Sequence, residues 1–502
     1  MKKVIVIGAG ISGLSAGCYA AMNGYESLIL EANPLPGGLC TSWRRKGYLI
    51  DGSCHSLMGV VPTSPYHLIW RELGAIQGRR IVDYEYFAGM TALDGQVFRL
   101  YTDPDRLERH MKELSPADAV PIEQLCGYIR KFAAFNAPVG KPGELMGFWD
   151  SAKMMAGMLP FLRLFGELAT VTMESFSARF QNPLLREGIK HANYGAPGSL
   201  FTVVMPLGWM SRKDGGYPVG GSLALARAVE SRYIGLGGTV RYDARVAKVL
   251  EWNGKATGVR LEDGMEMEAD TVISACDMKG TLTNLLDGSR MDPVHRELLD
   301  RGKLTAPVVQ VAIGADLVLP GSPPSQLEAF QLPEPISIGG NTVEWFNYKH
   351  YAYDPCMAPS GKSLLLSMFP CEWPYWEKFK RDPAAYRTEK ERIGEACIGA
   401  LEIRFPGIRT KVEMVDIATP LTYERYTGNW EGSIMTWLPD PEFDRRHRFI
   451  PKTVRGLDQF YLASMWTNSP GGLPGAAEAG RGVIQLLCAR DGKRFVTTMP
   501  PG

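Results

Sequence analysis

The chain opens on an uninterrupted apolar run, Val4–Ile7, which is followed at once by the glycine-rich segment Gly8–Gly13. A second apolar run follows Gly24 and ends at Glu31. Continuous apolar runs of this length are typical of strands that are buried on both faces. The pattern therefore predicts a strand, a tight turn, a helix and a second, parallel strand.

The glycines of this turn have the spacing of a phosphate-binding loop. Gly8 permits the tight turn, Gly10 leaves the backbone open to a pyrophosphate, and Gly13 lets helix and strand pack closely. The helix N-terminus then faces the negative charge of the phosphates. Glu31, eighteen positions after Gly13, can accept hydrogen bonds from ribose hydroxyls. The unit is predicted to hold the ADP half of a dinucleotide.

Two later segments indicate which dinucleotide. A Gly37-Gly38 pair follows Glu31, and near the far end a short apolar run, Phe460–Ala463, precedes the glycine-rich segment Pro470–Ala476 and a helical pattern over 477–487. In these features the chain resembles FAD enzymes of the glutathione-reductase and amine-oxidase type. The resemblance implies non-covalently bound FAD, with the second glycine segment near the flavin ring and ribityl chain.

The middle of the chain supplies a third part of this expected domain. Alternating strand-like runs over 244–250 and 256–261 are separated by Asn253-Gly254, and Asp263-Gly264 marks a second hairpin turn. This meander resembles the middle FAD segment of the family, which implies that Val246 contacts the adenine through its backbone.

The family resemblance has one departure. Where relatives carry an acidic residue after the C-terminal strand, this chain reads Ala463-Ser464-Met465-Trp466. Backbone amides are then expected to hold the flavin, and Trp466 is expected either to stack near it or to fill the core. The predicted cofactor contacts are Gly8, Gly10, Ile11, Ser12, Gly13, Glu31, Ala32, Gly37, Gly38, Leu39, Asp51, Val246, Trp466, Gly472, Leu473, Pro474 and Ala476.

The fold class that follows is α/β. A glutathione-reductase-type, Rossmann-like FAD domain is expected from residues 1–70, 215–285 and 445–502. An α+β substrate domain is expected from 71–214 and 286–444, interleaved with the first.

Within the superfamily the chain resembles phytoene desaturases, carotenoid isomerases and retinol saturases. The residues that carry this likeness are Gly47–His55, Tyr217–Gly221, Pro470–Ala476 and Thr422–Trp430. The resemblance implies a FAD-dependent desaturase, saturase or redox-neutral isomerase that acts on C–C bonds of an apolar polyene or isoprenoid-like substrate. The electron acceptor would be oxygen or a quinone, or none for an isomerase.

Few residues are candidates for acid–base chemistry. His55 follows the Asp51-Gly52 turn, which lies beneath the flavin in such folds, and an imidazole can move a proton in either direction near neutral pH. Hydrogen bonding to backbone or flavin is the alternative role for His55. Asp51 is expected to cap the turn or bind the cofactor. Tyr426 is the second catalytic candidate, beside Glu424 and Arg425, which can bind a polar substrate group or form ion pairs.

Composition and charge argue against several functions. The formal net charge is +1 with no long block of like charge, which gives no reason to expect nucleic acid as a partner. Nine scattered cysteines without CxxC spacing, and scattered histidines, predict reduced thiols and no metal site. A strand that begins at the N-terminus leaves no room for a signal peptide, so a cytoplasmic protein is expected.

An apolar stretch, Met154–Phe165, is too short and too charged at its borders to span a bilayer. It is expected either to lie in a membrane interface, where it would admit a lipid-soluble substrate, or to form a buried helix pair.

Two other functions compete with the leading one. A flavin amine oxidase is the first, although Ser469–Gly472 offers no cysteine for a covalent flavin. The second is a flavin-free prenyl-protein chaperone similar to Rab GDP-dissociation inhibitors. The intact glycine turn with Glu31 argues against the chaperone.

Overall fold

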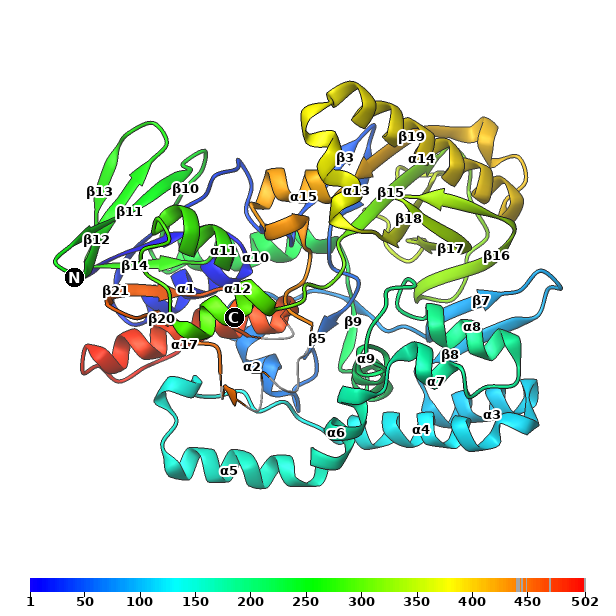
Figure 1. Cartoon of the computed structure of the whole chain (residues 1–502), viewed down its shortest axis with the longest axis horizontal. Helices are drawn as coiled ribbons and strands as arrows, with labels where there is room; N and C mark the ends of the chain where they lie inside the picture. Colours follow the sequence, from blue (N-terminus) through cyan, green and yellow to red (C-terminus); the bar gives the residue numbers. More distant parts are fainter. Residues whose placement is uncertain (439–442, 444–445, 448, 469–470, 501–502) are drawn as a thin grey trace.

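The computed structural model describes residues 1–438, 443, 446–447, 449–468 and 471–500. Within them the chain forms two sheets that lie side by side, with a helical region below the second (Figure 1). Residue 445, the predicted start of the third FAD segment, residues 469–470 of the second glycine segment, and 501–502 lie outside the described residues.

The first sheet contains the predicted nucleotide-binding unit. The central pairs β2–β1, β1–β14 and β14–β21 are all parallel, and the edge hairpin β11–β12 is antiparallel. Its strands run in the order β10 (Thr239–Arg241), β2 (Glu26–Leu30), β1 (Lys3–Ile7), β14 (Thr271–Ser274), β21 (Leu457–Leu462), β12 (Lys255–Leu261) and β11 (Val246–Trp252), with β13 (Glu266–Glu268) and β20 (Thr453–Val454) attached at the side. The sheet thus joins strands from the start, middle and end of the sequence.

Three helices pack against one face of this sheet. The helix α1 (Ile11–Met22) lies between α10 (Gly221–Gly235) and α17 (Gly472–Arg490). The approach of α1 to α17 is close, because a Cβ on Gly480 would lie 2.3 Å from the Ser12 carbonyl oxygen. The short helix α2 (Pro65–Glu72) packs beside α17.

The predicted turn at Asn253-Gly254 joins β11 to β12. Both residues have positive φ, 49° and 73°, as a tight two-residue hairpin requires. The local hairpin prediction is therefore confirmed.

The second sheet is mostly antiparallel. Its strands run in the order β19 (Val412–Ala418), β15 (Val308–Ala315), β18 (Ser363–Pro370), β17 (Asn341–His350), β16 (Ser325–Ile338), β7 (Tyr86–Thr91) and β8 (Val97–Tyr101). The long helix α14 (Pro383–Arg404) covers one face, and the short helices α13 (Trp373–Glu377) and α15 (Pro420–Thr427) lie at its edge (Figure 1). Two further small sheets pair β3 (Ser42–Arg45) with β4 (Tyr48–Asp51), and β9 (Gly215–Pro218) with β5 (Leu57–Met58) and β6 (Ile81–Val82).

A helical region continues from β8. Buried aromatic and aliphatic side chains of α4, α9 and the second sheet form one large hydrophobic core. The helices here are α3 (Pro104–Leu114), α4 (Ala119–Ala133), α5 (Phe148–Met158), α6 (Leu162–Thr170), α7 (Met173–Ser177), α8 (Pro183–His191) and α9 (Phe201–Ser211). Two short helices, α11 (Met278–Gly280) and α12 (Pro293–Arg301), follow β14.

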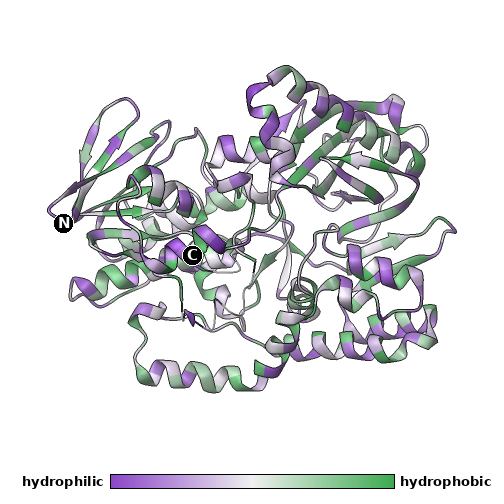
Figure 2. Ribbon diagram, in the orientation of Figure 1, coloured by the Kyte–Doolittle hydropathy of each residue, from purple (hydrophilic) through white to green (hydrophobic). Residues whose placement is uncertain are grey.

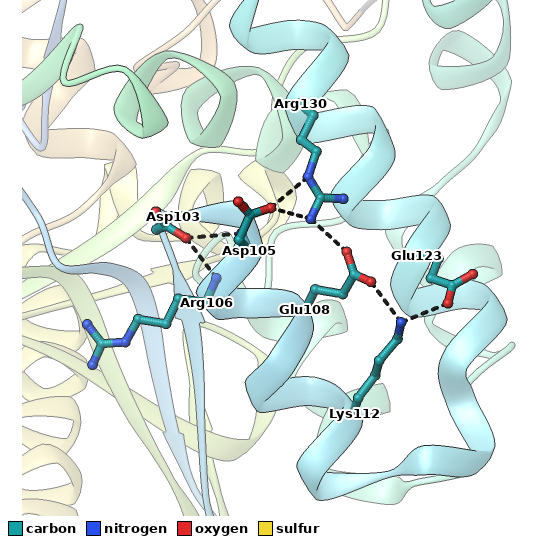
Figure 3. A network of polar contacts seen from close by, with 7 residues as sticks. All are labelled: Asp103, Asp105, Arg106, Glu108, Lys112, Glu123 and Arg130. Atoms are coloured by element: carbon teal, nitrogen blue, oxygen red, sulfur yellow. Dashed lines mark hydrogen bonds and ion pairs between the residues drawn. The ribbon is translucent and has the colours of Figure 1, made fainter.

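Charged side chains tie α3 to α4 on the surface. Arg130 of α4 contacts both Asp105 and Glu108 of α3, and Lys112 joins Glu108 to Glu123 (Figure 3). These groups are partly or largely exposed to solvent, so each pair contributes little stability.

The helix α5 differs from its neighbours because none of its residues is buried. It runs along the edge of the molecule, and much of it has hydrophobic colouring (Figures 1 and 2). Of the predicted stretch Met154–Phe165, the part in α5 is thus exposed rather than packed in a buried helix pair. Helix α6 buries Leu164 and Leu168 in the core, and the partly buried side chains of Met158 and Phe161 pack against it.

Candidate functional site

A cavity of about 1360 Å³ runs between the two sheets. It begins at the glycine turn after β1 and continues past the N-terminus of α17 to apolar residues of α9 and the second sheet. Most of the predicted cofactor residues line it: Gly8, Gly10, Ile11, Ser12, Glu31, Ala32, Gly37, Gly38, Leu39, Val246, Trp466, Gly472, Leu473, Pro474 and Ala476. The two predicted catalytic residues, His55 and Tyr426, line it as well.

The glycine turn has the geometry that the sequence predicts. Gly8 has φ of 98°, and Gly10 is the N-cap of α1. A Cβ on Gly13 would lie 1.9 Å from the Gly8 carbonyl oxygen. Gly13 therefore acts behind the cavity wall, by letting α1 approach the turn, and does not itself line the cavity.

Glu31 directly follows β2 and is almost fully buried. One carboxylate oxygen accepts a hydrogen bond from the Ala9 backbone N–H at 2.7 Å. The other accepts from the backbone and the side-chain amide of Asn33, at 2.9 and 2.8 Å. The carboxylate is thus fixed at the cavity wall, where its remaining lone pairs can meet ribose hydroxyls.

The second glycine segment brings another helix N-terminus to the same cavity. Helix α17 begins at Gly472, and a Cβ on Gly472 would meet no atom closer than 4.0 Å, at Pro474. Bare backbone and unpaired N–H groups of a helix end suit an anionic or polar part of a nucleotide. The residues present therefore fit a flavin dinucleotide.

The segment that lacks the acidic residue is apolar in the structure. Trp466 is fully buried; its ring packs edge-on against Trp437, with centroids 5.0 Å apart, and its carbonyl accepts a hydrogen bond from the Trp437 indole N–H. Trp466 thus serves as a core residue whose edge reaches the cavity. Ser464 is the polar residue of this stretch that lines the cavity.

Asp51 lies behind the cavity wall rather than on it. Its carboxylate accepts hydrogen bonds from the hydroxyl and backbone N–H of Ser222, at the start of α10, and from the Ser53 backbone N–H. Burial raises the pKa of Asp51. The geometry gives this residue the capping role that was one of its two predicted roles.

His55 lines the cavity and is surrounded by protein. Its Nδ1 lies 3.2 Å from the hydroxyl of Tyr194. Its carbonyl accepts hydrogen bonds from Tyr84 and from the Lys349 ammonium. Burial, with a smaller contribution from the Lys349 cation, lowers the pKa of His55 to about 3. The imidazole is therefore neutral at physiological pH.

Tyr426 lies at the Glu31 end of the cavity. Its backbone carbonyl accepts a hydrogen bond from the Asn33 side chain, which also contacts Glu31. Its ring is half exposed, with the Arg425 guanidinium 4.7 Å from the ring centroid. Glu424 forms its ion pair with Lys380. A catalytic role for Tyr426 stays a prediction, and its position favours a place beside the nucleotide.

Two residues that lie near His55 were not among the predicted site residues. Lys349 of β17 is 1% exposed and lies over the rings of Tyr84, Tyr217 and Tyr351. Its burial lowers its pKa to about 7. Tyr194 follows α8 and has φ of 56°, a left-handed conformation that is uncommon outside glycine. A lysine inside the aromatic run 345–351 was the one sequence signal for the first of them.

The structure also bears on the other composition-based predictions. All nine cysteines are free. Within the ranges that the structure describes, no three His, Cys, Asp or Glu side chains are grouped so that they could hold a metal ion. None of the helices in those ranges is both long and apolar enough to cross a bilayer.

Comparison with known proteins identifies the family to which these features correspond. Residues 11–485 match the protein family described as "flavin containing amine oxidoreductase". A lycopene-forming phytoene desaturase of Pseudescherichia vulneris is 24% identical over 97% of this chain and 99% of its own length. A chloroplastic prolycopene isomerase of Arabidopsis thaliana is 24% identical over 91% of this chain and 76% of its own.

The fold is shared with solved enzymes. A putrescine oxidase structure with bound putrescine superposes with a TM-score of 0.61 at 16% identity, covering 97% of this chain and 99% of the other. The α/β fold class with a Rossmann-like nucleotide-binding domain is thereby confirmed. At this identity the likeness concerns the fold alone.

Proposed function

Because the chain belongs to the flavin-containing amine oxidoreductase family, we propose that it is a FAD-dependent oxidoreductase that acts on C–C bonds of an apolar, polyene or isoprenoid-like substrate. The observation that carries the proposal is the continuity of one cavity, from the nucleotide cradle at Gly8–Ser12 to an apolar compartment. The relatedness to carotenoid desaturases and isomerases supports the same substrate class.

The cofactor would be held without a covalent bond. The backbone at Gly10–Ser12 would meet the pyrophosphate, Glu31 the ribose and Val246 the adenine, while Gly37–Leu39 and Gly472–Ala476 would enclose the flavin half. When bound, FAD supplies a hydride acceptor or donor. The protein supplies position and a compartment from which water is excluded.

The apolar compartment suits a substrate without charge. Its lining side chains include Phe87, Phe201, Met205, Trp209 and Met368. His55, which is neutral, holds a single ring proton and exchanges one hydrogen bond with Tyr194. We propose His55 as the polar contact nearest the reacting carbons, where it orients substrate and keeps the site uncharged. Oxygen or a quinone would reoxidise a desaturase, whereas an isomerase needs no acceptor.

Amine oxidation is the second candidate, since a putrescine oxidase shares the fold. An ammonium substrate calls for carboxylates in the substrate compartment. The cavity-lining carboxylates of the described chain are Glu31, Glu262, Asp277 and Glu478, and none comes from the second sheet. This distribution favours the apolar substrate.

Anaerobic single-turnover reactions test the proposal. A conjugated polyene should bleach the flavin absorption, or should rearrange when the enzyme is reduced beforehand, whereas primary amines should leave the flavin oxidised. Bleaching by amines alone would replace the proposal with amine oxidation. A purified protein that refuses FAD would leave only the flavin-free prenyl-protein chaperone.

We further propose that the protein is cytoplasmic and binds a membrane surface through α5. Phe148 and Trp149 are 79% and 82% exposed, and Met155 on the same helix is half exposed. Met154 of α5 lines the cavity, and the flanking cations Lys141 and Arg163 are ion-paired with Asp150 and Glu167. The exposed apolar residues of the helix suit a bilayer interface. From there a lipid-soluble substrate can enter the cavity directly.

A further inference from the structure

One buried ammonium group in the cavity wall makes no hydrogen bond or ion pair with the residues that the structure describes. Lys452, just before β20, lines the cavity and is only 5% exposed. Its backbone N–H donates to Glu144 at 2.8 Å, but its ammonium makes no hydrogen bond or ion pair within the described part of the chain. Its stem runs alongside Gly482 of α17, where a Cβ would lie 3.6 Å from Lys452 Cε, an ordinary van der Waals contact. Burial lowers the pKa of Lys452, and nearby carboxylates oppose the shift.

A buried carboxylate shares this part of the wall. Glu478 of α17 also lines the cavity, and one of its oxygens accepts a hydrogen bond from Tyr66 at 3.3 Å. The other oxygen has no hydrogen-bond partner among the residues described. Burial raises the pKa of Glu478, and the charges of Lys452 and Arg481 oppose that rise. The wall therefore offers free donors on Lys452 and a free acceptor on Glu478.

This pair lies away from the cofactor cradle. Helix α17 begins at Gly472, so Glu478 is about 9 Å and Gly482 about 15 Å along its axis, at 1.5 Å per residue. The exposed Gly140 and Lys141 also line the cavity, and the next residue, Pro142, lies beside Gly482 as Lys452 does. Lys452 and Glu478 thus stand on the route between solvent and the flavin end.

We propose that Lys452 and Glu478 form a subsite for a hydroxylated end of the substrate, an inference that rests on the proposed apolar-substrate function. The hydroxyl oxygen accepts from the Lys452 ammonium, and its proton is donated to the Glu478 carboxylate. The substrate is then an amphiphilic polyene alcohol, whose chain fills the apolar compartment while its hydroxyl stays at the mouth.

The charges of Lys452 and Glu478 determine which terminal group of the substrate binds best. A hydrocarbon leaves the buried donor and acceptor unpaired, which costs affinity. A carboxylic acid brings a third negative group to Lys452, beside Glu478 and Glu144, and offers no proton to Glu478. A hydroxyl matches both groups without adding charge.

Fluorescence titration of the FAD-loaded protein tests this ranking. The probes are parinaryl alcohol, parinaric acid and the corresponding octadecatetraene, which share one fluorescent chain. We expect the alcohol to bind about tenfold more tightly than either other probe. In Lys452→Met the alcohol should lose this advantage, because it loses its donor and the hydrocarbon no longer leaves a buried ammonium unpaired, and Lys452→Arg should retain most of it. Glu478→Gln should improve binding of the acid relative to the alcohol.

A control variant and two different negative results separate the subsite from the proposed function. Lys141→Met removes an exposed cation from the same end of the cavity and should leave the ranking intact. Equal binding of alcohol and hydrocarbon to the wild type, or equal losses for all probes in Lys452→Met, would refute the subsite and leave the proposed function standing. Failure of every probe to bind would refute the proposed function itself.

Discussion

The hydroxyl of Tyr194 lies 3.2 Å from Nδ1 of His55, although the two residues are 139 positions apart in the sequence. Tyr194 follows a helix of the helical region, and His55 follows the strand pair β3–β4 beside the nucleotide cradle. This contact closes the cavity wall at the junction of the two expected domains. The ionisation of His55 therefore depends on both.

Acid should destabilise the protein through His55. The folded-state pKa is about 3, against 6.5 for an ordinary imidazole, so between these values the unfolded chain binds the proton and the folded chain does not. Stability is lost as pH falls below about 6.5. Between pH 7 and pH 5 the loss from this group is about 2 kcal/mol. Chemical denaturation of the wild type and of His55→Gln at both pH values measures this loss of unfolding free energy. If the variant showed the same pH dependence as the wild type, the loss could not be assigned to His55.

Glu31→Ala should weaken cofactor binding. The substitution removes the ribose acceptor and leaves the N–H groups of Ala9 and Asn33 without their partner. We expect a loss of about tenfold or more in FAD affinity, measured by titration of the apoprotein. Glu26→Ala, an exposed carboxylate on the same strand β2, is the matched control. If Glu31→Ala bound FAD with unaltered affinity, Glu31 would make no contact with the ribose.

Gly13→Ala should damage both fold and cofactor site. The new Cβ would lie 1.9 Å from the Gly8 carbonyl, which forces α1 away from the turn. We expect the free energy of unfolding to fall by about 1–3 kcal/mol and most of the flavin to be lost on purification. Gly157→Ala, on exposed α5 with nothing within 4 Å, should change neither. Normal flavin content in Gly13→Ala would show that the turn tolerates displacement.

The double variant Phe148→Ser/Trp149→Ser should bind membranes poorly. Both rings are almost fully exposed on α5, so their removal takes apolar area from the interface without opening a core. Flotation with vesicles of anionic and neutral lipid should show about a tenfold loss of bound protein. Trp252→Ser, which removes a 71% exposed tryptophan at the end of β11, serves as the comparison. A loss of the same size in that variant would disprove docking through α5.

The parts predicted well from the sequence are those that local geometry determines. The turn from β1 into α1 needs Gly8, Gly10 and Gly13 whatever surrounds it, and the hairpin at Asn253-Gly254 needs two positive φ values. Residues that are close together in the sequence meet these requirements, so the sequence alone reveals them.

The parts that escaped prediction depend on distant pairing. Lys349 reaches the His55 carbonyl because β16 pairs with both β7 and β17, which joins segments more than 200 residues apart. The place of Tyr426 likewise depends on a contact between distant residues, because the Asn33 side chain donates to its backbone carbonyl across 393 positions, and its catalytic role stays a prediction. No local pattern states where two such segments meet.

The last strand, β21, lies between β14 and β12, and Gly480 of the final helix touches Ser12 of the first. During synthesis on the ribosome, the nucleotide-binding site around the first glycine turn therefore cannot be completed until almost the entire polypeptide has emerged. Coenzyme capture then becomes a late event in biogenesis, and messages truncated upstream of α17 would yield chains that bind no flavin.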